Sequence, residues 1–206
     1  MKKKIMIYSI LLLVLTGLIY PQQEERRAKV IFNFGGGYSV LTGDGSEYWN
    51  PGFYLSTTLF TPISSTVSLG GLVSYHRWTP DETELTKDID DIPGVDVDVS
   101  GMGRIIEIAP VVRYNVPKTN SVGFFFQVAG GMALMELSAL VEVSVLWIHE
   151  SVRIDESENR PFISVGMGLS IGKPQQIQVE ILALYHINFI EDGTMDYFSA
   201  GLGLGF

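Results

Sequence analysis

Apolar and polar side chains alternate along most of the chain beyond its first 27 residues. The clearest stretch is 177–190, in which Ile177, Val179 and Ile181 occupy successive odd positions. In an extended strand, successive side chains point to opposite faces, so the pattern repeats every two residues. A helix needs a period near 3.6 residues. This alternation predicts eight strands, over residues 28–40, 51–61, 65–78, 103–116, 121–135, 161–171, 177–190 and 197–206.

The connections between these strands alternate between short and long. Three short links contain proline, at 61–64, 117–120 and 173–176, and 191–194 is also short, whereas 41–50, 79–102 and 136–160 are long. Short turns at one rim and long loops at the other are typical of outer-membrane barrels, with both chain ends in the periplasm. The segment 136–148 is itself strand-like, and we expect it to extend its hairpin beyond the membrane. The pattern predicts an all-β fold, a closed up-and-down antiparallel transmembrane β-barrel of about eight strands.

The two faces of the predicted strands differ in polarity. One face is almost uniformly Ile, Val, Leu and Phe, and the other is rich in Gly, Ser, Asn and Gln. A soluble lipocalin-like barrel would turn its apolar face inward and cover its outside with polar groups. We expect the uniform face to contact lipid. Aromatic residues near strand ends are expected to form the girdles at the two membrane interfaces: Tyr38, Phe53, Tyr75, Trp78, Tyr114, Phe189 and Phe198.

Six polar side chains fall on the predicted inner face of the barrel. Because an unpaired buried charge is costly, we expect a buried network in which the carboxylates pair with arginine and with the ring donors. The alternative is a narrow polar conduit or a ligand pocket, which inward glycines would favour. The predicted interior residues are Glu107, Arg113, Gln127, Glu180, His186 and His76.

The first 20 residues differ from the rest of the chain. Lys2, Lys3 and Lys4 precede a long apolar stretch, which is the pattern of a secretory signal peptide. We expect a signal peptide helix over 1–20 whose cleavage point the sequence leaves open, a short periplasmic lead-in over 21–27 and the barrel over 28–206. An uncleaved membrane anchor is the alternative.

The net charge and the cysteine content exclude several classes of protein. The formal net charge of the whole chain is -9, and removing the three lysines leaves 11 basic residues against 23 acidic ones. An acidic protein of this kind is unsuited to nucleic acid, which requires excess positive charge. The absence of cysteine excludes disulfides and thiolate metal sites.

The end of the chain resembles a known family. Residues 199–206, Ser-Ala-Gly-Leu-Gly-Leu-Gly-Phe, are similar to the terminal strand motif of outer-membrane β-barrels, and the whole pattern resembles the small OmpA/OmpX-type barrels. The resemblance implies that periplasmic chaperones and the barrel-assembly machinery recognise this strand, with Gly201, Leu204 and Phe206 as the assembly signal. Leu204 stands where an aromatic residue is common.

Candidate chemistry outside the interior is sparse. The loop 79–102 is acidic, and carboxylates at Asp88, Asp90, Asp91, Asp96 and Asp98 are weak candidates for Ca²⁺. Their spacing does not match the calcium-loop motif, so we expect a solvated acidic loop and no metal. Neither G-x-S-x-G nor H-E-x-x-H occurs, and the His-x-Ser-Asn run of lipid A deacylases is replaced by His186-Ile187-Asn188.

The sequence therefore predicts a monomeric, non-enzymatic protein of the bacterial outer membrane that needs no cofactor. It would contact outer-membrane lipids, present acidic loops at the cell surface and have a structural, adhesive or interaction role. A narrow pore or small hydrophobic-solute channel is the first alternative. A lipid-modifying outer-membrane enzyme and a soluble lipocalin-like binder are the others.

Overall fold

The computed structural model describes residues 30–43, 46–87, 94–117, 121–145, 148–172, 177–191 and 193–206. The predicted signal peptide (1–20) and lead-in (21–27) lie outside these ranges. Among the described residues, no helix has the length and hydropathy needed to cross a bilayer.

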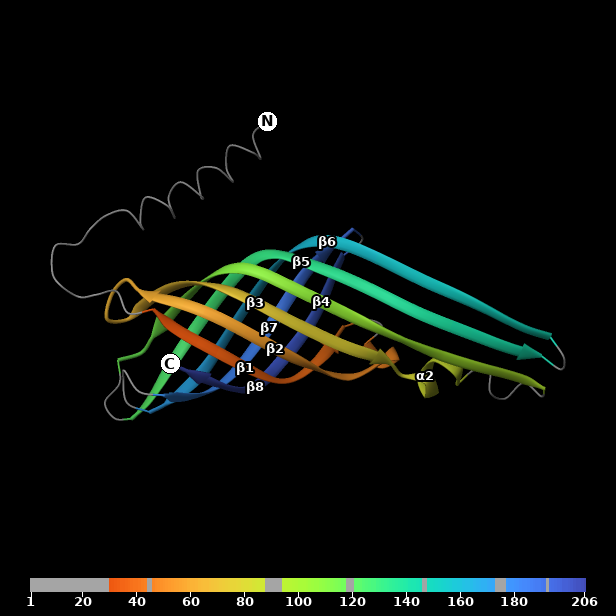
Figure 1. Cartoon of the computed structure of the whole chain (residues 1–206), viewed down its shortest axis with the longest axis horizontal. Helices are drawn as coiled ribbons and strands as arrows, with labels where there is room; N and C mark the ends of the chain where they lie inside the picture. The colour runs from red at the N-terminus through yellow and green to blue at the C-terminus, as the bar shows by residue number, and fades with distance from the viewer. Residues whose placement is uncertain are drawn as a thin grey trace, which may run out of the picture.

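Eight antiparallel strands form one closed barrel, in which each strand pairs with its neighbour in sequence and the last pairs with the first (Figure 1). Closure is direct, because Phe34 and Leu204 are register partners between the first and last strands. The predicted up-and-down barrel is confirmed. Its strands are β1 (Ile31–Thr42), β2 (Trp49–Pro62), β3 (Val67–Pro80), β4 (Val95–Asn115), β5 (Val122–Val145), β6 (Ile148–Ile171), β7 (Gln178–Ile190) and β8 (Gly193–Gly205), with two short helical turns, η1 (Ser46–Tyr48) and α2 (Glu82–Thr86).

Three strands are much longer than predicted. Residues 136–148 were expected to extend their hairpin, and β5, which runs to Val145, confirms this. The rest of the long connection, 149–160, was not expected to be strand, but β6 begins at Ile148; β5 and β6 have 24 residues each. Strand β4 begins at Val95, so the later part of the predicted loop 79–102 is also strand. The charged residues in 149–160 interrupt the alternation of apolar and polar positions that would predict a strand there. Each of its residues up to Arg160 nevertheless has a partner on β5, which holds the segment extended.

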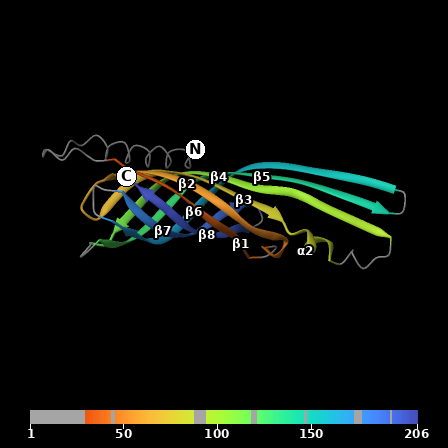
Figure 2. The same cartoon turned by 60° about the horizontal axis from the view of Figure 1, so that its bottom comes forward.

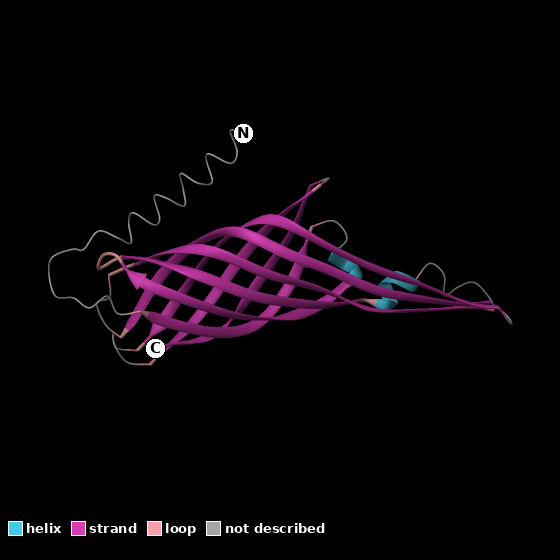
Figure 3. Ribbon diagram, turned by 45° about the horizontal axis from the view of Figure 1, so that its top comes forward, coloured by secondary structure: helices cyan, strands magenta, loops and turns pink. Residues whose placement is uncertain are grey.

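These extensions form a three-stranded sheet that protrudes from one end of the barrel (Figures 1 and 2). The last described pair between β3 and β4 is Trp78 with Gly103, and pairing between β6 and β7 starts only at Phe162. We call residues 95–102, 138–145 and 148–155 the projecting sheet. Its outer strands each have one edge without a strand partner in the described residues. Helix α2 lies near its base (Figure 3).

The outer surface of the barrel is apolar, as the alternation predicted. Leu55, Ile108 and Leu202 are exposed although they lie within the strands, and the residues next to them in sequence face inward or are less exposed. A soluble lipocalin-like barrel would have the reverse arrangement. The exterior and the closed sheet are those of a protein that sits in lipid.

The interior of the barrel is filled by side chains. Large rings occupy it, and Phe60, Phe125 and Tyr197 are almost completely buried. Glycine makes room for one of these rings, because a Cβ atom at Gly168 would collide with the Phe125 ring. An eight-stranded barrel has an interior of about this capacity.

The prediction of the aromatic girdle was wrong for one residue. Trp78 is only 1% exposed and packs inside the barrel, whereas Tyr38 is 75% exposed on the outside. Residues three apart on a strand lie on opposite faces, so Tyr75 and Trp78 cannot both point outward. The remaining predicted girdle residues are on the outer surface: Phe53, Tyr75, Tyr114, Phe189 and Phe198.

Candidate functional site

The structure places all six predicted polar residues inside the barrel, where each is buried. They do not form one network, however. Glu180 and Gln127 contact Arg113, and His76 and His186 contact Glu107. We call these the arginine cluster (Arg113, Gln127, Glu180 and Asn33) and the histidine cluster (Glu107, His76, His186 and the hydroxyl residues that contact them).

The arginine cluster is built on a buried ion pair. Arg113 donates from Nη1 to Glu180 Oε1 at 2.7 Å and from Nη2 to Glu180 Oε2 at 3.1 Å. Arg113 Nη2 also donates to Gln127, and the Asn33 amide donates to Glu180. Cation–π contacts cover both sides of the guanidinium, since its carbon lies 4.2 Å from the Phe60 ring centroid and 4.0 Å from that of Phe125. This geometry satisfies both charges of the pair.

The histidine cluster surrounds the fully buried Glu107 carboxylate. Its Oε1 atom lies 3.0 Å from His186 Nδ1, and its Oε2 atom lies 3.7 Å from His76 Nε2. Ser74 donates to Oε2 at 2.7 Å, and the Tyr197 hydroxyl donates to Oε1. His76 and His186 thus present two ring nitrogens to one carboxylate, and the three ligand atoms lie within 4.8 Å of one another. This donor set is one that a metal ion could use.

Aromatic rings enclose the histidine cluster. The His76 ring is stacked between Tyr54 and Trp78, at centroid distances of 5.6 Å and 5.7 Å. The His186 ring stacks on Tyr197 at 4.3 Å. These contacts fix the orientation of both imidazoles and exclude solvent from them.

One chain of hydrogen bonds has the order of a catalytic triad. Ser199 Oγ lies 3.0 Å from His186 Nε2, and the opposite ring nitrogen contacts Glu107. In acyl transfer the serine must reach a substrate carbonyl beside oxyanion donors. Ser199 has no exposed surface, and it lies in the filled interior. The order of groups is present, but a place for a substrate is not found among the described residues.

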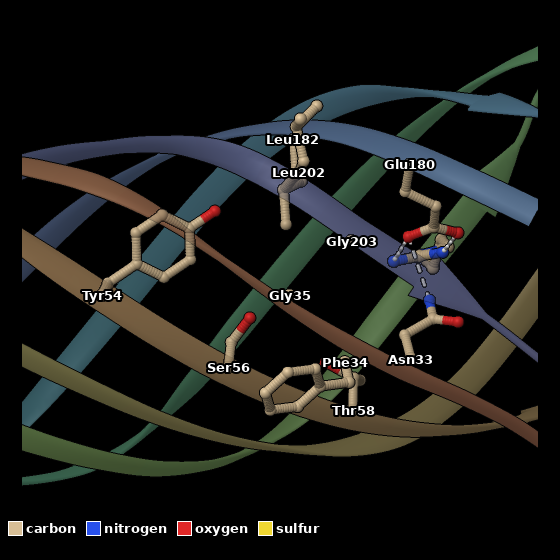
Figure 4. Close-up of a pocket in the computed structure, with 11 residues that line it drawn as sticks. Asn33, Phe34, Gly35, Tyr54, Ser56, Thr58, Glu180, Leu182, Leu202 and Gly203 are labelled. Carbon is tan, nitrogen blue, oxygen red and sulfur yellow. Dashed lines mark hydrogen bonds and ion pairs between the residues drawn. The ribbon is translucent and has the colours of Figure 1, made fainter.

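The free space inside the barrel is small. A cavity of about 20 Å³ lies between Tyr54 and the Arg113–Glu180 pair, with Asn33 and Ser56 among its lining residues (Figure 4). That volume accommodates about one water molecule. Large side chains such as Phe60 and Phe125 occupy the interior around it, which does not favour a ligand pocket or conduit.

The projecting sheet has one polar face and one apolar face. The apolar face continues the inner face of the barrel and contains cross-strand pairs such as Val97 with Val143 and Val141 with Val152. The opposite face continues the lipid-facing surface, yet it carries charge, with Asp98 paired to Glu142. This change from apolar to charged marks the end of the membrane-contacting surface. This face also carries one charge, Glu150, whose register partner is Val143, and its apolar members are Val95, Val97, Val99, Val141, Val143, Val145, Val152 and Ile154.

Hydrogen bonds organise the polar face near its base. Arg153 donates to Asp155 at 2.7 Å, and Ser138 donates to the same carboxylate at 2.7 Å. The Arg153 guanidinium and the Ser138 hydroxyl hold the pKa of the Asp155 carboxyl below its usual range. His149 bonds to Ser144 across the hairpin at 2.7 Å.

The weak calcium candidates divide between two locations. Asp88, Asp90 and Asp91 lie outside the described residues. Asp96 and Asp98 were expected in a loop but lie exposed on β4, because residues 95–102 pair with β5. Alternate residues on a strand share one face, so their carboxylates cannot wrap around an ion as a loop does.

The predicted assembly signal lies at the end of β8. Leu204 and Phe206 face outward and are exposed, whereas Gly201 is on the inner face. Phe206 exchanges two backbone hydrogen bonds with Phe32, which secures the last residue to β1. Its role in assembly stays a prediction.

Sequence reasoning missed several members of the interior clusters. Ser39, Tyr197 and Ser199 contact the histidine cluster, and Asn33 contacts Glu180. Alternation had placed Tyr197 and Ser199 together on one face of the last strand, so the signal was present. A serine on the inner face of a barrel is too common to single out, and only the register shows that it meets a histidine.

Solved structures share this architecture. Neisserial surface protein A (NspA) superposes with a TM-score of 0.51 at 11% identity, over 85% of this chain and 95% of that chain. Ail, the attachment invasion locus protein of Yersinia pestis, gives 0.45 at 16% identity, over 86% and 97%. The outer membrane enzyme PagL gives 0.41 at 13% identity, over 84% and 98%.

No protein-family model matches the chain, and no curated protein matches it in sequence. At 11% identity, the likeness to NspA concerns the fold. The chain has the fold of the small eight-stranded outer-membrane β-barrels.

Proposed function

We propose that this protein is a non-enzymatic interaction protein of the outer membrane, in which a filled barrel anchors a projecting sheet that binds a protein partner at the cell surface. The apolar face of that sheet carries the proposal. It holds valine and isoleucine side chains beyond the membrane-contacting surface, with Val152 58% exposed and Ile154 40% exposed. Exposed apolar patches with polar surroundings are typical of protein-binding surfaces.

The two faces of the sheet suit this role. The charged face, with Asp98, Glu142 and Arg153, keeps the sheet soluble and separate from lipid. The apolar face continues the inner face of the barrel. The β6 edge over 148–161 has no strand partner in the described residues, and its charges oppose uncontrolled pairing with other strands. A protein partner with an apolar surface segment would bury the valines.

A non-enzymatic role is supported by the complete burial of Ser199 and by the missing hydrolase motifs. The pore alternative has no comparable support, because large side chains fill the interior. Periplasmic chaperones and the barrel-assembly machinery are the partners proposed for biogenesis, acting on Leu204 and Phe206. The folded barrel is proposed to act as a monomer.

Adjacent residues on opposite faces of the sheet provide the test. A non-adherent laboratory strain would display the protein, and its adherence to surfaces coated with fibronectin, laminin or collagen would be counted. Val141→Lys places a charge between Val99 and Val152 on the apolar face and should abolish the adherence gained over cells without the protein. Glu142→Lys is the matched control and should retain it. Equal adherence of the two variants, or no gain on any coating, would contradict the proposal.

A further inference from the structure

The Glu107 carboxylate lies at the centre of the barrel without a permanent cation. It is fully buried, and the Arg113 guanidinium is already paired with Glu180. Across the described ranges, the only nitrogen groups that form an ion pair with Glu107 belong to His76 and His186. Hydrogen bonds from Ser74, Tyr197 and the His186 ring compensate part of the cost of burying this charge, and a bound cation would compensate it directly.

We propose that His76, Glu107 and His186 form a binding site for a divalent transition-metal ion, with Zn²⁺ as the ion that fits best. Two imidazoles and a carboxylate are a familiar zinc donor set. Bonds of about 2.0–2.1 Å to a tetrahedral ion place neighbouring ligand atoms about 3.4 Å apart. The carboxylate oxygens here lie 3.0 Å from His186 Nδ1 and 3.7 Å from His76 Nε2. The three ligand atoms lie within 4.8 Å of one another, so they would draw together by up to about 1.4 Å to hold a tetrahedral ion.

Neighbouring hydroxyls already orient each ligand. The ring nitrogen of His76 that faces away from Glu107 lies 3.3 Å from Ser39 Oγ, and the corresponding nitrogen of His186 lies 3.0 Å from Ser199 Oγ. Each hydroxyl can accept the ring N–H and leave the other nitrogen free to bind the ion. Tyr197 and Ser74 donate hydrogen bonds to the Glu107 carboxylate and orient it. Metal-binding histidines and carboxylates in proteins usually have supporting hydrogen bonds of this kind.

The ion would join β7 to two strands with which it does not pair. His76 lies on β3 and Glu107 on the neighbouring β4, whereas His186 lies on β7, across the closed sheet. The stacked rings of Tyr54, Trp78 and Tyr197 enclose the site, so the ion would enter as the barrel closes. Binding only to the folded barrel would stabilise it.

Metal content is the direct test. The protein is purified without a histidine tag from outer membranes, washed with chelator, and analysed for metals by mass spectrometry. We expect about one zinc ion per barrel. His186→Gln and Glu107→Gln should lose the ion. His149→Gln is the matched control, because His149 lies on the projecting sheet, where its ring bonds to Ser144.

Refolding keeps the proposal testable if the interior variants do not fold. The wild-type chain is refolded from urea into detergent micelles with ZnCl₂ or with chelator, and folding is followed by heat-dependent gel mobility. At free Zn²⁺ about one hundred times its Kd, the folded-to-unfolded ratio should rise about a hundredfold. A zinc-free barrel whose urea midpoint is the same in both conditions would overturn the site. So would retention of the ion by folded His186→Gln and Glu107→Gln barrels.

Discussion

Arg113 on β4 and Glu180 on β7 join opposite sides of the barrel through two hydrogen bonds of 2.7 Å and 3.1 Å. These strands are not neighbours in the sheet, so the pair braces the interior from within. Both side chains are nearly free of solvent contact. Each charge can be buried in the barrel interior only because the other one compensates it.

Glu180→Ala should lower the free energy of unfolding by about 3–5 kcal/mol, because it leaves the buried Arg113 guanidinium without its partner. Urea unfolding in detergent micelles, followed by gel mobility without boiling, measures this. Arg153→Ala removes an exposed ion pair on the projecting sheet and should leave the urea midpoint unchanged. A Glu180→Ala midpoint equal to that of the wild type would show that the pair does not brace the barrel.

Trp78→Ala should destabilise the barrel by about 3–5 kcal/mol, because it leaves a cavity beside His76 and Tyr197. Tyr75→Ala, on the lipid-facing side of the same strand, should cost clearly less. The same unfolding assay compares them. If the two losses were reversed, the inward placement of Trp78 would be incorrect.

Leu55→Arg should cost about 2–4 kcal/mol, because it puts a charge at the middle of a lipid-facing strand. Ile63→Arg is the control in the short turn after β2, where the cost should be about 0–1 kcal/mol. Refolding yields and unfolding midpoints in lipid bilayers provide the comparison. Equal tolerance at both sites would contradict a membrane-spanning barrel.

The purified protein should show no steady single-channel conductance in planar bilayers. Trp78, Tyr197, Phe60 and Phe125 fill the interior, and the cavity there is only about 20 Å³. A trace without unit steps, from bilayers shown to contain the folded barrel, is the expected result. A reproducible unit conductance would favour the narrow-channel alternative and show that the interior side chains move aside.

Much of the architecture was predictable because its signals are local. Strand alternation, short prolyl turns and the apolar face predicted a closed barrel with lipid on its outside, and the six polar residues were placed on the correct face. The errors arose where a local rule was misapplied or overridden. Trp78 was assigned against the parity of its own strand, and 149–160 is held extended by pairing with β5 despite its charges.

The sequence by itself determined which side chains point into the barrel, because a period of two is a property of each strand alone. Only the tertiary structure decided which of them meet. Glu107 and His186 are 79 positions apart, and Arg113 and Glu180 are 67 apart, so their contacts depend on strand register and barrel closure. Each cluster joins β4 to β7, which do not pair in the sheet, so the interior could separate into an arginine cluster and a histidine cluster only once the sheet had closed.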